Sequence, residues 1–198
     1  MPEPSAPDPP ISRFPVPDLA DLPDDVRARI DAVQEQAGFI PNVYLALAHR
    51  PDEFRAFFAY YDALMLKPGG LSKAEREMIV VATSAVNACH YCLTTHGALL
   101  RVYAKNPLLG DQVAHNYRKA DLTPRERAIC DFAVLIASDS ADCSEDDFAA
   151  LRAHGLSEDE IWDVGAITSL FALSNRLANL TAMRPNPEFF ALARAPRT

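Results

Sequence analysis

Four capping-box patterns, or near variants of one, recur from residue 72 onwards and mark successive helix starts. Each is a Ser or Thr followed three residues later by an acidic residue: Ser72 and Glu75, Thr123 and Glu126, Ser144 and Asp147, and Ser157 and Glu160. Such a pair satisfies free backbone donors at the start of a helix. The last one should open a long apolar-faced helix, with residues 162–183 as its main body, that stops before Pro185. Because β-branched alternation is scarce, the chain is predicted to be all-α.

Two further helices are expected upstream of these patterns. The first spans residues 24–37 and ends at Gly38. The second spans residues 51–66, takes Asp52 as its candidate N-cap and ends before Pro68. Glycine past the last helical residue and proline beyond it are the usual stop signals. From residue 24 to residue 198 we therefore expect a single all-α domain.

Residues 1–23 contain eight prolines, which exclude a regular helix and favour an extended arm. Apolar residues are interleaved with these prolines: Ile11, Phe14, Val16 and Leu19. A stiff segment with apolar anchors loses little entropy on docking. We expect a homo-oligomer in which the arm packs on a neighbouring subunit. The alternatives are an arm that folds back on its own subunit or stays disordered.

Two stretches of the chain read as copies of one unit. Residues 71–78 align with residues 122–129 at a constant offset of 51, which divides the domain into units of about 71–121 and 122–184. The copies differ at chemically important positions: Glu77 aligns with Ala128, Cys89 with Ser140, His96 with Asp147, and Cys92 with Cys143. If the alignment holds, the first unit kept a chemical function and the second became scaffold.

Charge and hydropathy exclude several classes of function. The formal net charge is −8, and no basic tract is present, which argues against a nucleic-acid partner. No run approaches the ~20 apolar residues that cross a bilayer, and no secretory signal is visible, so we expect a cytoplasmic protein without a membrane partner. In that reducing compartment, a close pair of cysteines is more often catalytic, redox-sensing or metal-binding than structural.

The pair in question is Cys89 and Cys92, followed by His96. Two thiols separated by two residues can close a disulfide, and spacings of three and four residues put all three side chains on one helix face. Asn87 is a candidate N-cap for this helix, which would leave Cys89 in the first turn, where the helix dipole favours a thiolate. The segment therefore predicts a dithiol redox site.

A carboxylate on the preceding helix can complete this group. Glu77 lies in the helix expected over residues 73–86, with Ser84 on the same face. If Glu77 reaches the space beside His96, carboxylate, imidazole and thiol form a relay. The other two cysteines read differently: Cys130 lies in an apolar helical pattern as a buried inert thiol, and Cys143 lies in a polar turn and is assigned no role.

The pattern Glu77-x11-Cys89-x-Tyr91-Cys92-x3-His96 resembles the carboxymuconolactone decarboxylase and AhpD-like alkylhydroperoxidase superfamily, and most closely its peroxidase-related branch. The similarity extends to residues 14–17, 38–42, 122–127 and 175–176, so it covers nearly the whole chain. One position departs from the well-studied AhpD pattern, in which the residue before the second cysteine is a histidine and not a tyrosine.

The resemblance implies an all-α AhpD-like helical bundle and a thiol-dependent peroxidase. Cys89 and Cys92 would be the redox pair, and Glu77 and His96 would be the proton relay. One thiolate would attack hydrogen peroxide or an organic hydroperoxide, the second thiol would close a disulfide, and an external dithiol or thioredoxin-like reductant would reset the site. The resemblance implies no cofactor and an oligomeric assembly.

Three alternatives remain at this stage, and one of them is a scaffold that retains the motif without turnover. A carboxymuconolactone-decarboxylase-type enzyme would rely on acid–base residues alone, and the intact cysteine pair argues against it. A metal-binding module would use Cys89, Cys92, His96 and Glu77 as ligands. Structural zinc sites usually draw their ligands from two separate loops, which disfavours the metal-binding module.

Overall fold

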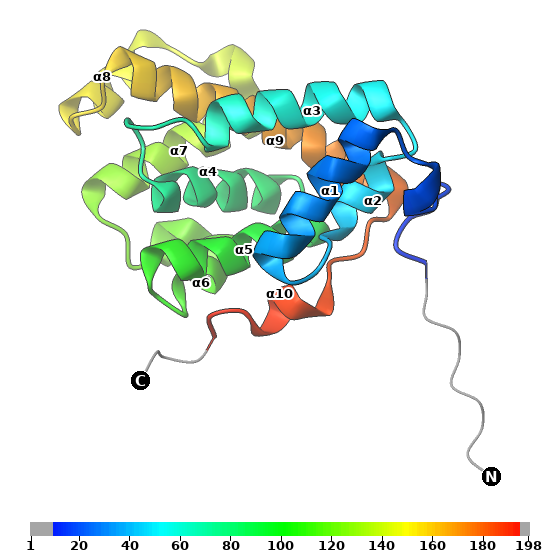
Figure 1. Ribbon diagram of the computed structural model, residues 1–198. Coiled ribbons are helices and arrows are strands. Elements are labelled where there is room, and N and C mark those ends of the chain that lie inside the picture. The colour runs from blue at the N-terminus through cyan, green and yellow to red at the C-terminus, as the bar shows by residue number, and fades with distance from the viewer. Residues whose placement is uncertain (1–9, 195–198) are drawn as a thin grey trace.

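A computed structural model of the protein describes residues 10–194, and within that range the chain forms helices and no strand (Figure 1). The prediction of an all-α fold is confirmed. The α-helices are α1 (Asp24–Ala37), α2 (Asn42–Leu47), α3 (Pro51–Met65), α4 (Lys73–Val86), α5 (His90–Ala104), α6 (Leu109–Asn116), α7 (Pro124–Asp139), α8 (Glu145–Ala153), α9 (Glu158–Thr181) and α10 (Pro187–Ala191). Single 3-10 turns are η1 (Leu19–Asp21), η2 (Tyr117–Lys119) and η3 (Ser140–Asp142).

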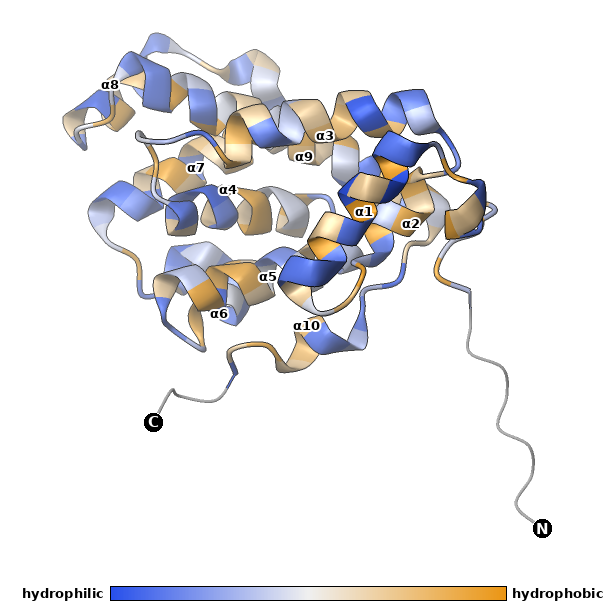
Figure 2. Ribbon diagram, in the orientation of Figure 1, coloured by the Kyte–Doolittle hydropathy of each residue, from blue (hydrophilic) through white to orange (hydrophobic). Residues whose placement is uncertain are grey.

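Helix α4 is the centre of the bundle. It packs on α5, α7 and α9 and is buried without interruption from Arg76 to Ser84. One apolar cluster joins α4 to α3, α7 and α9, and a second joins it to α5, α6 and α7. Each outer helix contains both hydrophilic and hydrophobic residues (Figure 2), as expected for amphipathic helices that pack over a core. The side chains from Arg76 to Ser84 are therefore closely packed on all sides.

The helix starts follow the capping patterns, with one error in the upstream prediction. Ser72, Thr123 and Ser157 each accept a hydrogen bond from the amide three residues on, as capping boxes require. Asp52, however, is not an N-cap. Helix α3 begins at Pro51, because proline has no amide hydrogen to satisfy at this position, and Asp52 lies in the first turn.

The long C-terminal helix also differs from its predicted limits. It runs continuously over Glu158–Thr181, and Ala182, in the left-handed region with φ 52°, ends it. The amide of Met183 then bonds to the Ala178 carbonyl, which closes the helix end. A left-handed alanine carries no sequence signature, which is why the end at Thr181 was not predicted.

The two units proposed from the offset of 51 share a structural device. Arg76 of α4 and Arg127 of α7 each donate hydrogen bonds to backbone carbonyls of the segment that precedes their own helix. The carbonyls belong to Met65, Lys67 and Gly69 for Arg76, and to Tyr117, Arg118 and Ala120 for Arg127. A guanidinium fork suits this role because its donors have fixed directions. The division of the domain into two units stays a prediction.

The N-terminal arm lies against its own subunit where the structure describes it. The Arg13 amide donates to the Thr181 carbonyl at 2.7 Å, and the Arg184 amide donates to the Ile11 carbonyl at 3.1 Å. Phe14 stacks on His49 with ring centroids 5.8 Å apart. Over residues 11–14, the arm therefore folds back on its own subunit, as the first alternative expected. Residues 1–9 of the arm lie outside the described range, and contact with a neighbouring subunit stays a prediction.

Helix α6 approaches α5 unusually closely beside the histidine predicted for the relay. A Cβ at Gly110 would lie 2.4 Å from the carbonyl oxygen of Gly97, so any side chain at 110 would push α6 away from α5. Gly97 directly follows His96. This backbone contact holds α5 against α6 at the residue that follows the imidazole.

Candidate active site

Helices α4 and α5 bring the predicted carboxylate and imidazole together. The Oε2 atom of Glu77 lies 2.7 Å from Nδ1 of His96, and both side chains are buried. The edge of the imidazole ring meets Phe171 of α9 at a centroid distance of 4.7 Å. A carboxylate on Nδ1 fixes the tautomer of a histidine and leaves Nε2 to exchange a proton with another group. The pairing of Glu77 and His96 was expected from sequence.

The connection between these helices is longer than the sequence indicated. Asn87 is the C-cap of α4 and not the N-cap of α5; Ala88, with φ 46°, reverses the chain, and Cys89 itself is the N-cap of α5. Its Sγ accepts a hydrogen bond from the Cys92 amide at 3.5 Å. The sulfur of Cys89 thus occupies the position where a capping oxygen usually lies, at the positive end of the helix dipole.

This position shapes the acidity of both thiols. Hydrogen bonding from the Cys92 thiol lowers the pKa of Cys89 to about 7 against the opposing effect of burial, and the Cys92 amide, the Asn175 side chain and His96 lower it further. The pKa of Cys92 is raised well above its ordinary value, mainly because its thiol donates to Cys89 and because it is buried. One sulfur of the pair therefore ionises near neutral pH while the other keeps its proton.

Two polar residues of α9 complete the site, and sequence reasoning assigned them no role. Asn175 is fully buried; its Nδ2 donates to Ser84 Oγ at 3.0 Å and its Oδ1 accepts from Asn87 Nδ2 at 3.2 Å. The Oγ of Ser174 lies 4.0 Å from Cys92 Sγ. A signal was available, because Ser174 and Asn175 are adjacent polar residues within a helix predicted to be apolar-faced, and a buried polar group needs a hydrogen-bond partner.

Helix α2 covers the two sulfurs. Ala46 of α2 and Ala178 of α9 pack in one cluster with Cys89, Tyr91 and Cys92, and both sulfur-bearing residues are at most 1% exposed. The amide of Val43, a free donor in the first turn of α2, donates to the hydroxyl of Tyr91 at 3.1 Å. Tyr91, the residue that departs from the AhpD pattern, therefore links α2 to α5.

Helix α2 is also tied to the segment after α9. The side-chain oxygen of Asn186 accepts from the Asn42 amide at 2.8 Å, and its Nδ2 donates to the Ile40 carbonyl at 2.8 Å. The side chain of Asn42 donates in turn to the Arg184 carbonyl. These bonds hold the same N-terminal end of α2 that Val43 links to Tyr91.

The remaining cysteines and His90 lie apart from this group. Cys130 is buried, and burial raises its pKa, as expected for an inert thiol. Cys143 is half-buried against the cluster of α3, α4, α7 and α9, and His90 is exposed. Between residues 10 and 194, no three His, Cys, Asp or Glu side chains are placed to hold one metal ion. The metal-module alternative therefore has no support from this geometry.

The part of the chain that the structure describes contains no helix that is both long enough and apolar enough to cross a membrane.

Comparisons with known proteins place the chain in a family. Residues 51–107, which include all four predicted site residues, match the carboxymuconolactone decarboxylase family. A peroxidase-related protein with an alkylhydroperoxidase AhpD core from Ralstonia eutropha JMP134 is 63% identical, with a TM-score of 0.94, 95% of this chain covered and 99% of that chain. A peroxidase-related protein from Silicibacter sp. TM1040 is 40% identical, with a TM-score of 0.89 and coverages of 96% and 100%.

A more distant structure, the debrominase Bmp8, is 18% identical with a TM-score of 0.70 over 92% of this chain and 95% of that chain, which shows a common fold. No curated protein matches the sequence. The two closer similarities extend over nearly the full length of both chains. Together with the helical fold and the family match, they show that this chain belongs to the carboxymuconolactone decarboxylase and AhpD-like family.

Proposed function

We propose that the protein is a thiol peroxidase that reduces hydrogen peroxide or organic hydroperoxides through Cys89 and Cys92. The observation that carries the proposal is the lowered pKa of Cys89 at the N-terminus of α5, beside a second thiol and near a buried Glu77–His96 pair. A thiolate at neutral pH is the reactive form toward peroxides. The AhpD-like relatives carry the same fold, and two of them are described as peroxidase-related.

The chemistry follows from these positions. The Cys89 thiolate attacks one peroxide oxygen; an S–O bond forms, the O–O bond breaks, and the departing oxygen takes a proton to leave as water or an alcohol. His96, held by Glu77, supplies that proton. Cys92 then attacks the sulfenic sulfur, which forms an S–S bond and releases water. The pair has given two electrons to the peroxide, and an external dithiol returns them.

The acid–base alternative within the family would use Glu77 and His96 without sulfur. Nothing in such a reaction requires a thiol of lowered pKa or a second thiol that hydrogen-bonds to it. The arrangement of Cys89 and Cys92 therefore favours the dithiol reaction. Replacing both cysteines by serine distinguishes the two, because only the dithiol enzyme loses its activity.

A thiol count before and after exposure to peroxide tests the proposal. The fully reduced chain has four free thiols, at Cys89, Cys92, Cys130 and Cys143. One equivalent of hydrogen peroxide should remove the first two and leave the others free to alkylate after denaturation. Mass spectrometry should then find a disulfide within residues 89–92. If both thiols of the pair still alkylate after peroxide treatment of the folded protein, the proposal is wrong.

A further inference from the structure

The two sulfurs of the candidate site are closed off from solvent. Cys89 is 0% exposed and Cys92 is 1% exposed. Hydrogen peroxide is close to water in size, so small fluctuations of the packing admit it. A protein dithiol is far larger, and its thiolate has to reach one sulfur of a disulfide directly. An external protein dithiol therefore cannot reduce a Cys89–Cys92 disulfide until part of the cover over the pair moves away.

Helix α2, which covers the sulfurs, is anchored on α3. It has six residues and no side-chain hydrogen bond at its N-cap, and helices this short depend on tertiary contacts for their stability. Tyr44, its largest buried side chain, stacks on Phe58 of α3 at a centroid distance of 4.2 Å. Toward the cysteine cluster it places two small side chains, Val43 and Ala46. Helix α2 can therefore part from α5 while it stays on α3.

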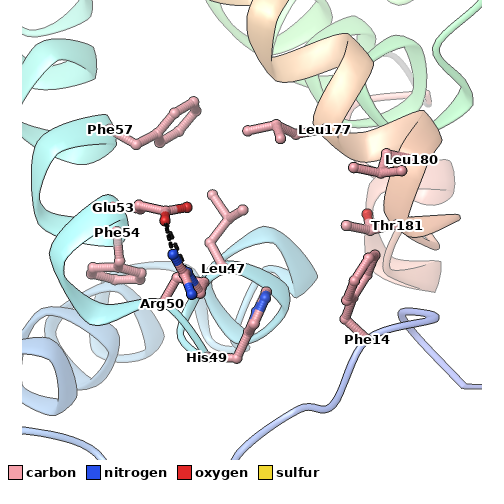
Figure 3. A pocket seen from close by; sticks show the side chains of 10 residues that line it. All are labelled: Phe14, Leu47, His49, Arg50, Glu53, Phe54, Phe57, Leu177, Leu180 and Thr181. Carbon is pink, nitrogen blue, oxygen red and sulfur yellow. Dashed lines mark hydrogen bonds and ion pairs between the residues drawn. The ribbon is translucent and has the colours of Figure 1, made fainter.

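Open space lies beside α2. A cavity of about 470 Å³ separates side chains of α3 from those of the C-terminal part of α9, and Leu47 of α2 lines it (Figure 3). Leu47 directly follows Ala46, which packs against the cysteines. A helix that is closely packed on every side cannot shift without steric overlap. Because α2 borders this cavity, its side chains have room to move when it leaves the sulfurs.

One hydrogen bond ties α2 to the helix that carries the thiols. The hydroxyl of Tyr91, which is 3% exposed, accepts from the Val43 amide at 3.1 Å. This amide lies in the first turn of α2, where the helix itself supplies no acceptor. Breaking a buried hydrogen bond leaves donor and acceptor unpaired, which costs free energy. The bond therefore favours the closed position of α2.

We propose that α2 is a gate over the dithiol pair, that the Tyr91 hydroxyl holds it closed, and that it opens for the reducing step. The inference rests on the proposed peroxidase function and adds how the external protein dithiol reaches the site. Tyr91 is a positioning residue, because it acts through α2 and exchanges neither protons nor electrons with the peroxide.

The step that needs the open gate is a thiol–disulfide exchange. One thiolate of the external dithiol attacks a sulfur of the Cys89–Cys92 disulfide; a mixed disulfide forms, and the other site sulfur leaves as a thiolate. The second thiol of the dithiol then attacks the mixed disulfide and frees the remaining site sulfur. Two electrons pass to the pair, the two protons of the dithiol end on the site sulfurs, and the reductant leaves as a disulfide.

The test measures reduction and oxidation separately in the full-length protein. The disulfide form is prepared with diamide, and its reduction by reduced thioredoxin is followed by acid quenching, alkylation and mass spectrometry. Tyr91→Phe should speed this reduction about fivefold, since loss of one hydrogen bond shifts the opening equilibrium by about that factor. Oxidation of the reduced variant by hydrogen peroxide should stay within about twofold of wild type.

Tyr117→Phe is the matched control. The Tyr117 hydroxyl donates to Asp131 at 2.7 Å, and Tyr117 packs in the cluster that joins α4 to α5, α6 and α7. The same atom is removed and a hydrogen bond is lost, but at a place that does not hold α2. This variant should change neither rate, which separates release of the gate from general loss of stability.

A second variant loosens the same end of α2 by another route. Asn186→Ala removes the bonds to the Asn42 amide and the Ile40 carbonyl, and reduction by thioredoxin should again speed up severalfold. Thermal melting checks that each variant is folded. The inference is overturned if neither variant speeds reduction, or if oxidation by hydrogen peroxide speeds up as much as reduction does.

The use of diamide keeps this inference apart from the proposed function. If the wild type consumes no peroxide although both variants speed reduction of the disulfide, the proposed peroxidase function is wrong and the gate stands. If the wild type consumes peroxide and neither variant speeds reduction, only the gate is wrong.

Discussion

The unit of α4 and α5 and the unit of α7 and α8 begin alike and end differently. Each starts with a capping box and an arginine that holds the preceding loop. In the first, Ala88 turns the chain directly into α5, and Glu77 meets His96. In the second, η3 intervenes before α8 begins. The two shared features, the capping box and the arginine, start a helix and hold the loop before it, so they serve the scaffold.

At the aligned positions, the predicted second unit has residues that serve its packing and its helix start. Ala128 stands where the first unit has Glu77, and it packs at the edge of a core cluster. Asp147, aligned with His96, accepts hydrogen bonds from the backbone and hydroxyl of Ser144 at the start of α8. Its carboxylate therefore serves a helix start, and the second unit holds no counterpart of the carboxylate–imidazole pair.

The largest expected difference between the units lies in their aligned cysteines. Cys92→Ser should reduce steady-state peroxide consumption with a thioredoxin-like reductant to background, because no intramolecular disulfide can form for that reductant to reduce. Cys143→Ser, the matched change in the second unit, should leave the rate within about twofold, as substitutions away from a site usually do. Coupled peroxide assays on both variants measure this. Equal losses would mean that the comparison between the units does not locate the chemistry.

Glu77→Gln tests the residue that the second unit lacks. The amide keeps the shape and can still accept from His96, but it cannot stabilise a charged imidazole. We expect peroxide reduction to slow by about a hundredfold, a typical contribution of general acid–base catalysis. Stopped-flow oxidation of the reduced protein measures this step, with thermal melting as the control for folding. A rate within about twofold of wild type would exclude the relay.

The two loop-holding arginines provide a comparison of stability. Arg76 is 3% exposed, whereas Arg127 is half-buried. Replacing either by Met removes three hydrogen bonds to backbone carbonyls, but the Tyr117 and Ala120 carbonyls keep backbone donors, and Arg127 lies closer to solvent than Arg76. We expect losses in the free energy of unfolding of about 3 kcal/mol for Arg76→Met and about 1 kcal/mol for Arg127→Met. Urea unfolding measures both, and the reverse order would contradict this account.

The smallest expected effect concerns acidity. Asn175→Leu removes an amide that lowers the pKa of Cys89, so this pKa should rise from about 7 toward the ordinary value of 9.0. Alkylation by iodoacetamide should then slow severalfold at neutral pH and converge with wild type at alkaline pH, where the thiolate forms in both. Asn179→Leu, one turn on and exposed, is the control. An unmoved midpoint in the pH profile would show that Asn175 does not act on the thiolate.

The sequence predicted features set by local chemistry and missed those set by backbone geometry or distant contacts. Capping boxes locate helix starts because their donors and acceptors lie within four residues. The N-cap position of Cys89 was missed because Ala88 adopts a positive φ that few non-glycine residues adopt. Asn175 was not assigned a role because its partners, Ser84 and Asn87, come from an element far away in sequence. The cover formed by α2 depends on packing that no spacing encodes.

The candidate acid, base and both sulfurs all lie within residues 77–96, on two helices joined by a turn at Ala88. The proposed reactive groups thus lie on one helical hairpin, while α2, α3 and α9 contribute the surroundings. Groups on a single continuous segment keep their relative positions when residues of the surrounding helices are substituted. Substitutions in the walls can therefore change what the chain accepts while the groups that react stay in place, which gives such a chain a route to new substrates through its surroundings alone.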